Sequence, residues 1–198
     1  MNKIQIIVNN GAGTGSAVAV WKETKEYLQE NKISYNAYLT RYEKHAVKLA
    51  GQICEKIPEG PIYLLVVGGD GTINEVLNGI TDFDRVRLGV IPTGSGNDFA
   101  RNLGILRNTR EDLQEITACI GQEQNGEKLQ RIDLGKVSWE GCEKPRIFGI
   151  SAGAGLDAIV CKKALHSKLK KILNRFHLGK LTYLMLTVQT LFSMRTFH

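Results

Sequence analysis

The feature that most constrains the fold of this chain is a unit that recurs along roughly its first 120 residues. In each unit, a short apolar run is followed by a turn and then by a segment with helical spacing. Strands that alternate with helices in this way are joined by right-handed crossovers, which place them in one sheet with helices on both faces. The sequence therefore predicts an α/β protein with a doubly wound, mostly parallel sheet.

Four apolar runs are the expected strands, at residues 4–8, 35–39, 62–67 and 88–91. The expected helices cover residues 16–31, 45–56, 73–80, 97–103 and 110–120. Ligands of such sheets bind beyond the carboxyl ends of the strands. Three glycine-rich turns follow the first, third and fourth strands, so they are predicted to converge at one edge.

The pattern changes after Gly121. A polar break at 122–126 precedes two partly alternating segments, 129–139 and 146–151, with a glycine turn between them. This arrangement favours antiparallel pairing. Helical patterns follow at residues 156–177 and 181–196. We expect a first domain at 1–124 and, at 125–198, an incomplete second domain of antiparallel strands plus helices.

Charge is unevenly distributed along the 198 residues. The net charge is +6, yet eight Lys and Arg residues and no Asp or Glu follow residue 160. The basic character belongs to the tail, so we expect no nucleic-acid partner. The four cysteines show no C-x-x-C spacing, and no secretory signal begins the sequence, which indicates reduced thiols and a cytoplasmic location.

The strongest chemical signal is the turn G-G-D-G-T-I-N-E at 68–75. Glycines after a buried strand let the backbone approach a ligand, and the amides of Gly71, Thr72 and Ile73 at a helix start favour phosphate. A carboxylate at Asp70 suits such a turn if a divalent metal separates it from the phosphates. The alternative is a plain strand-to-helix connection in which Asp70 is the N-cap.

The turn after the first strand is N-N-G-A-G-T-G, at 9–15. It is neither a Walker A motif nor a dinucleotide fingerprint, because no Gly-Lys-Ser/Thr follows and the glycine spacing differs. Taken alone, it is also compatible with a flexible turn. Thr40, at the carboxyl end of the second strand, is placed either to bond a nucleotide or to cap its own loop.

The third turn is P-T-G-S-G-N-D-F-A-R, at 92–101. Thr93 and Ser95 offer hydroxyls, and the intervening glycines allow a close backbone approach. Arg101 is placed either to contact phosphate or to pair with Asp98 three residues earlier on the same helix.

Together these residues resemble the diacylglycerol kinase catalytic domain family, in particular the bacterial lipid kinases. The resemblance is carried by residues 68–75, 92–105, 40–46, 131–135 and 149–158. NAD kinases and phosphofructokinases share the Gly-Gly-Asp-Gly turn but not the run at 92–101.

The resemblance implies ATP and Mg²⁺ as cofactors and residues 1–124 as the nucleotide-binding domain. Asp70 would be the catalytic residue, which orients the metal or, alternatively, takes the hydroxyl proton. Magnesium would be organised by Asp70, Asp98 and Asp133, although Asp133 is equally explained as an acid that bonds local amides. The expected ATP contacts are Asn9, Asn10, Gly11, Ala12, Gly13, Thr40, Gly69, Asp70, Gly71, Thr72, Ile73, Asn74, Glu75, Thr93, Ser95 and Asn97.

Two departures from the family pattern stand out. The chain has Asn9-Asn10 where the family commonly has Asn-Pro, which is expected to loosen the loop without removing phosphate donors. It also ends at His198 without the Asp-Gly-Glu segment that is thought to supply the family's general base. We therefore expect a truncated frame or a fragment, in which nucleotide binding survives better than turnover.

The implied reaction is transfer of the ATP γ-phosphoryl group to a lipid hydroxyl such as that of diacylglycerol, a step in phospholipid biosynthesis. The alternatives are an NAD-kinase-like enzyme with a soluble acceptor and a non-catalytic ATP-binding fragment. The expected partner is a membrane lipid, and a homodimer stays open. The basic segment 162–180 is either an amphipathic helix on the anionic inner face of the membrane or a helix packed on the second domain.

Overall fold

The computed structural model describes residues 3–9, 11, 16–105, 108–126, 129–153, 155–166 and 187–190. Two compact units are distinguished along the chain, Met1–Ile150 and Ser151–His198.

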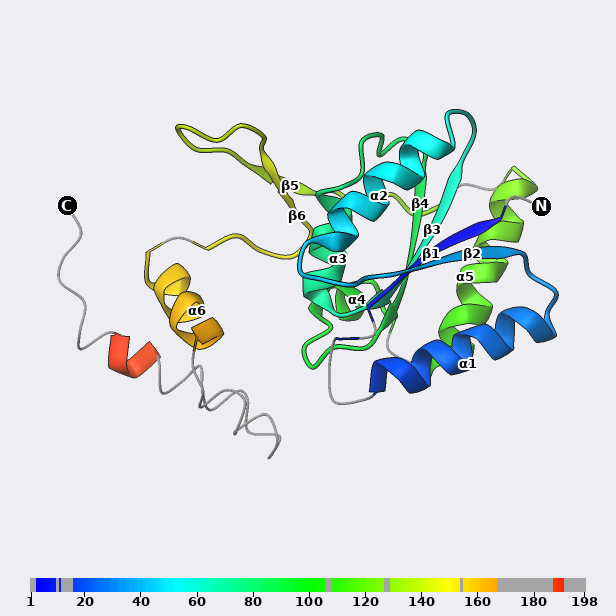
Figure 1. The fold of residues 1–198 in the computed structure, drawn as a ribbon, viewed down its shortest axis with the longest axis horizontal. Coiled ribbons are helices and arrows are strands. Elements are labelled where there is room, and N and C mark those ends of the chain that lie inside the picture. The colour runs from blue at the N-terminus through cyan, green and yellow to red at the C-terminus, as the bar shows by residue number, and fades with distance from the viewer. Residues whose placement is uncertain are drawn as a thin grey trace. The chain divides into compact units, whose positions relative to one another are not determined.

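The first unit is built on a four-stranded sheet with the strand order β2-β1-β3-β4 (Figure 1). All three neighbouring pairs are parallel, with Ile4 opposite Tyr35, Gln5 opposite Leu64 and Ile62 opposite Val86. The strands are β1 (Ile4–Val8), β2 (Tyr35–Leu39), β3 (Ile62–Gly68) and β4 (Val86–Pro92). The predicted parallel sheet is confirmed.

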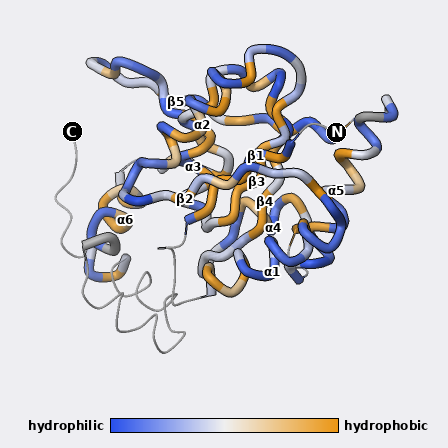
Figure 2. The backbone as a smooth tube through the Cα atoms, turned by 45° about the vertical axis from the view of Figure 1, so that its right-hand side comes forward, coloured by the Kyte–Doolittle hydropathy of each residue, from blue (hydrophilic) through white to orange (hydrophobic). Residues whose placement is uncertain are grey.

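Helices cover both faces of this sheet, also as predicted (Figure 1). On one face lie α1 (Ser16–Glu30) and α5 (Thr109–Gln124), and on the other lie α2 (His45–Lys56), α3 (Asp70–Leu77) and α4 (Asp98–Asn102). Successive residues of a strand point to opposite faces, so Leu65 packs with the first group and Val66 with the second. Hydrophobic residues concentrate on the central strands because both faces are covered (Figure 2).

An ion pair joins the two helices of the first face at the surface. Arg110 of α5 donates from Nη1 and Nη2 to the carboxylate of Glu30, which ends α1, at 2.9 and 3.0 Å. These hydrogen bonds hold the pKa of Glu30 below its ordinary value, and the pKa of Arg110 is raised by the same contact.

On the other face, α2 packs closely against the end of α3 at Gly79. A Cβ on Gly79 would lie 2.1 Å from the carbonyl oxygen of Val47 and 2.9 Å from Cβ of Ala50. Because the nearest atom belongs to the backbone of α2, a larger residue would force the helices apart.

A second sheet pairs β5 (Gly135–Val137) with β6 (Arg146–Phe148) in antiparallel fashion. These strands are shorter than the segments 129–139 and 146–151 expected from the sequence. Residues 130–133 and 138–141 are exposed, so they bury no surface that would extend the pairing. This sheet belongs with the first unit, and the boundary at residue 124 stays a prediction.

The side chain of Asn78 connects this sheet to the end of α3. Its Nδ2 donates to the carbonyl of Ile147 at 2.8 Å, and its Oδ1 accepts from the amide of Ile147 at 3.0 Å. The carboxamide thus pairs with β6 as a neighbouring strand would, and Ile147 packs against the core beneath α2 and α3.

In the second unit, the structure describes α6 (Leu156–His166) and a helical turn at 187–190. Lys163 Nζ donates to Thr190 Oγ1 at 3.1 Å. Most of the expected helices at 156–177 and 181–196 lies outside the described residues, as does the basic segment from residue 167 onward. Among the helices that are described, none has the length and apolar character needed to cross a bilayer.

Candidate functional site

The turns that follow β1, β3 and β4 meet at the carboxyl edge of the parallel sheet. The Thr93 amide donates to the Gly68 carbonyl at 3.0 Å. Asn9 Nδ2 donates to Thr72 Oγ1 at 2.8 Å. A Cβ on Gly69 would lie 3.1 Å from Cα of Gly94, so this approach depends on the absence of a side chain. The predicted convergence of the three turns is confirmed.

Asp70 joins the turn after β3 to the turn after β4. Its Oδ1 accepts from the Phe99 amide at 3.1 Å and its Oδ2 from the Asp98 amide at 3.2 Å, at the start of α4. The N-cap of α3 is Gly69, so Asp70 does not cap its own helix. A carboxylate offers about four lone-pair positions, so those not used by the two amides can serve a metal or another donor.

The first turn of α3 supplies the amides expected to face phosphate, with one correction. The Ile73 amide donates to the Gly69 carbonyl at 3.1 Å within the helix, so the prediction that this amide is offered to phosphate is wrong. The amides of Asp70, Gly71 and Thr72 precede this first helical bond and have no acceptor within the helix. Around the Cβ position of Gly71 no atom lies within 4 Å, so the space there is open.

In the turn after β4, the side chain of Asn97 shapes the backbone. Its Oδ1 accepts from the Gly94 amide at 2.9 Å, its Nδ2 donates to the Gly94 carbonyl at 2.8 Å, and its φ is +53°. The carboxamide is therefore used within the loop. Ser95 is exposed, whereas the hydroxyl of Thr93 is buried without a hydrogen-bond partner among the described residues.

The structure decides between the two roles considered for Arg101. Its Nη1 lies 2.6 Å from Asp98 Oδ1, and its Nη2 donates to the Gly96 carbonyl at 2.9 Å. Arg101 thus pairs with Asp98.

Two of the three carboxylates expected to organise a metal lie beside the same glycine. A Cβ on Gly96 would lie 3.1 Å from Oδ2 of Asp70 and 3.5 Å from Oδ2 of Asp98. Asp133 is exposed, and within the described ranges no three His, Cys, Asp or Glu residues form a group able to hold a metal. Two carboxylates still fit Mg²⁺, which in phosphate-binding sites commonly takes one or two carboxylates and completes its shell with substrate oxygens and water.

Other predicted contact residues take part in structural interactions. Asn74 Oδ1 accepts from Asn78 Nδ2 at 3.3 Å, toward the end of α3. The Glu75 carboxylate accepts from the amides of Lys44 and Ala46 at 3.0 and 3.2 Å, at the start of α2. Sequence spacing gave no signal for the Glu75 contacts, because the partners are backbone amides 31 and 29 residues away.

The remaining predicted residues lie along the same edge or outside the described chain. Thr40 continues the ladder of β2, since its amide donates to the Val8 carbonyl at 2.9 Å. The Gly11 amide donates to Asn9 Oδ1 at 3.1 Å. Asn10, Ala12 and Gly13 are outside the described residues.

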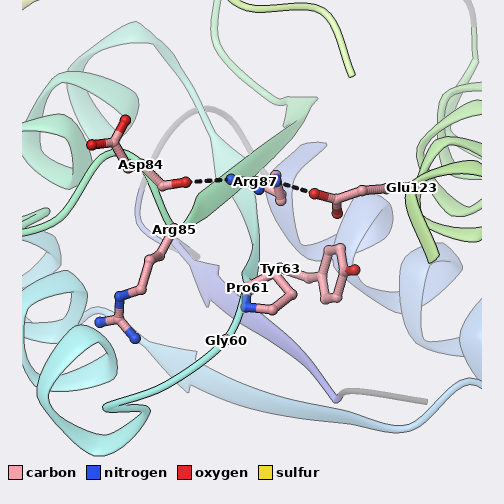
Figure 3. A pocket seen from close by; sticks show the side chains of 7 residues that line it. All are labelled: Gly60, Pro61, Tyr63, Asp84, Arg85, Arg87 and Glu123. Atoms are coloured by element: carbon pink, nitrogen blue, oxygen red, sulfur yellow. Dashed lines mark hydrogen bonds and ion pairs between the residues drawn. The ribbon is translucent and has the colours of Figure 1, made fainter. Parts of the chain in front are cut away.

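A cavity of about 430 Å³ opens at the opposite edge of the sheet, by the amino ends of β3 and β4 (Figure 3). Within it, Arg87 pairs with Glu123 and donates to the Asp84 carbonyl at 2.7 Å. None of the predicted site residues lines it; the lining consists of Gly60, Pro61, Tyr63, Asp84, Arg85, Arg87 and Glu123.

Comparison with known proteins identifies the family. Residues 3–137 match the model of the diacylglycerol kinase catalytic domain. The chain belongs to this family. The resemblance seen in the glycine-rich turns is thereby confirmed for the diacylglycerol kinase catalytic domain, and the turns described above are part of it.

Relatives of this diacylglycerol kinase domain carry kinase names. The chain is 32% identical over 180 residues to the Bacillus subtilis protein named "Putative lipid kinase YtlR", covering 89% of this chain and 55% of that protein. It is 35% identical over 156 residues to the diacylglycerol kinase of the same organism, covering 76% and 45%. A solved diacylglycerol kinase structure from Bacillus anthracis matches with a TM-score of 0.50 at 30% identity, over 59% of this chain and 39% of that one. The chain spans about half the length of the curated relatives it matches.

Proposed function

We propose that this protein is an ATP-dependent lipid kinase that transfers the γ-phosphoryl group to a lipid hydroxyl such as that of diacylglycerol. The observation that carries the proposal is the meeting of three turns at one sheet edge. There the carboxylates of Asp70 and Asp98 lie beside Gly96, next to the first amides of α3. Catalysis of phosphoryl transfer depends mostly on positioning and on neutralising charge, and this edge offers both.

Different residues of this edge would bind different parts of a triphosphate and its metal ion. The amides of Gly71 and Thr72, which have no acceptor within the helix, suit phosphate oxygens because the start of a helix carries partial positive charge. Asp70 fixes the start of α4 against the start of α3, so the two turns keep a constant spacing. Asp70 and Asp98, with Asp133 as the family resemblance implies, would hold a Mg²⁺ ion whose charge offsets that of the phosphates.

The lipid acceptor is proposed from the family and from the names of the relatives, which include lipid kinase and diacylglycerol kinase. A soluble acceptor such as NAD is the competing outcome. The basic segment 162–180 supports a lipid acceptor, since it would hold the protein at an anionic membrane surface.

The proposal is tested by measuring binding and transfer on the same sample. We expect Mg·ATP to bind in calorimetry. We expect labelled phosphate to pass from ATP to dispersed diacylglycerol and not to NAD, at a low rate because nucleotide binding is expected to survive better than turnover in this chain. Asp84→Asn, at the opposite edge of the sheet, is the matched control and should behave as the unaltered chain. Absence of ATP binding would refute the proposal. Binding without transfer to any acceptor would instead favour a non-catalytic nucleotide-binding module.

A further inference from the structure

We propose that the segment Arg41–Ala46, which follows β2, binds the base of the nucleotide, with the exposed ring of Tyr42 as the stacking surface. This inference rests on the proposed function and deepens it, because it assigns the end of the site at which the base is recognised.

The first observation is a pair of stacked rings that follows β2, in which Tyr42 is exposed and His45 is half-buried. The ring centroids of Tyr42 and His45 lie 4.4 Å apart with 22° between the ring planes. Tyr42 is 59% exposed. His45 covers one face of the tyrosine ring, so a base would stack on the opposite face. A planar base with a π-face can stack on such a surface whatever its hydrogen-bonding pattern.

The second observation is that this aromatic pair is held in place. His45 Nδ1 accepts from the Arg41 amide at 3.1 Å, and the His45 amide donates to the Tyr42 carbonyl at 3.2 Å. Lys44 adopts the left-handed region with φ of +65°, which sharpens the turn. A ring fixed before the ligand arrives loses little conformational entropy on binding.

Glu75 connects this segment to the helix that begins at Asp70. Its two oxygens accept from the amides of Lys44 and Ala46. These are amides at the start of α2, so they are already occupied and are not offered to phosphate. Glu75 is therefore a positioning residue, which keeps the aromatic pair at a constant place relative to the phosphate-binding turn.

The third observation is the order of the strand ends along the edge. The ladder continues one residue beyond β2, β1 and β4, through amide-to-carbonyl bonds from Thr40 to Val8, Asn9 to Val67 and Thr93 to Gly68. The four strand ends form a row of three interstrand steps, about 14 Å long at a spacing of about 4.8 Å. This length suits an extended nucleoside triphosphate, with its phosphates at β3 and β4 and its base at β2.

The test compares a ligand that has a base with one that lacks it. In Tyr42→Ala we expect the dissociation constant for Mg·ATP to rise about 5- to 150-fold, the range measured for loss of a base–aromatic stack. The constant for inorganic tripolyphosphate should stay unchanged. Tyr42→Phe keeps the ring and should bind both ligands normally. Trp139→Ala removes another aromatic side chain with 59% exposure and is the matched control.

Glu75→Gln tests the positioning role, because the amide group keeps only one of the two acceptors. We expect it to weaken ATP binding while leaving tripolyphosphate binding unchanged. The proposal is overturned if Tyr42→Ala affects both ligands equally or affects neither. If the unaltered chain binds neither ATP nor tripolyphosphate, the proposed kinase function itself fails, and that result is distinct from a failure confined to the base.

Discussion

Replacement of Asp70 by Asn is expected to lower stability, in addition to its effect on the proposed metal binding. In the structure, both carboxylate oxygens accept backbone amides from the start of α4. Asparagine has one acceptor oxygen, and in place of the second it carries a carboxamide NH2, which would face one of those backbone amides donor to donor. The substitution therefore removes one hydrogen bond and converts the other from a charged to a neutral acceptor.

The magnitude follows from the two bonds. A hydrogen bond to a charged group contributes about 1.5–3 kcal/mol and a neutral one about 1 kcal/mol. One bond is lost and one is weakened, so we expect the free energy of unfolding to fall by about 2–5 kcal/mol. Asp98→Asn is the control, because Asp98 and Arg101 are 56% and 58% exposed, and exposed pairs contribute at most about 1 kcal/mol.

Urea unfolding followed by circular dichroism measures both variants in the absence of nucleotide. The midpoint should fall in Asp70→Asn with the slope unchanged, which identifies a loss of stability and not a change of the unfolded state. An Asp70→Asn protein as stable as Asp98→Asn would refute the capping role. A loss of the proposed kinase activity on replacing Asp70 would thus have two causes, which only a paired stability measurement separates.

Three further predictions concern the scaffold. In urea unfolding, Gly79→Ala should lower the free energy of unfolding by several kcal/mol, because the new Cβ would meet the backbone of α2. Gly121→Ala in α5 should raise the free energy of unfolding by about 0.5–1 kcal/mol, because the space around its Cβ position is open. Asn78→Ala should speed hydrogen exchange in β5 and β6 and leave the parallel sheet protected; equal loosening of both sheets would contradict the link through Asn78. In an NMR titration, the pKa of Glu30 should lie below its ordinary value and return to that value in Arg110→Gln. The stability that this ion pair contributes is therefore present above the ordinary pKa of Glu30 and is lost as the pH falls through the lowered pKa. An unchanged Glu30 titration in Arg110→Gln would rule out that pairing in solution.

The parallel sheet could be predicted closely because its signals are local. The structure places β1, β2 and α2 at the residues expected from apolar runs and turns. Helix α3 begins three residues earlier than expected, at Asp70, since the strand ends at Gly68 and Gly69 serves as the N-cap. The sequence overestimates the lengths of β5 and β6. The length of a strand depends on what it packs against, and alternation of apolar and polar residues alone does not show this.

The sequence predicts where the candidate site lies on the sheet, but it does not predict in which direction each side chain points. Parallel strands end at one edge, so the meeting of the turns followed from the fold class. The sequence could not show that Asn97 turns back onto Gly94 or that Glu75 reaches across to α2. A motif specifies which residues are present, whereas their directions depend on partners that are distant along the chain.

The short helix α3 carries three polar contacts that point to three different elements. Asp70 at its start bonds α4, Glu75 bonds α2, and Asn78 just beyond its end bonds β6. Each residue of an α-helix turns by about 100°, so one residue inserted between Asp70 and Asn78 would swing these side chains out of register. Such an insertion would leave every glycine of the motif intact and still disconnect the β5–β6 sheet from the edge where the three turns meet, so the length of α3 is as restricted as its composition.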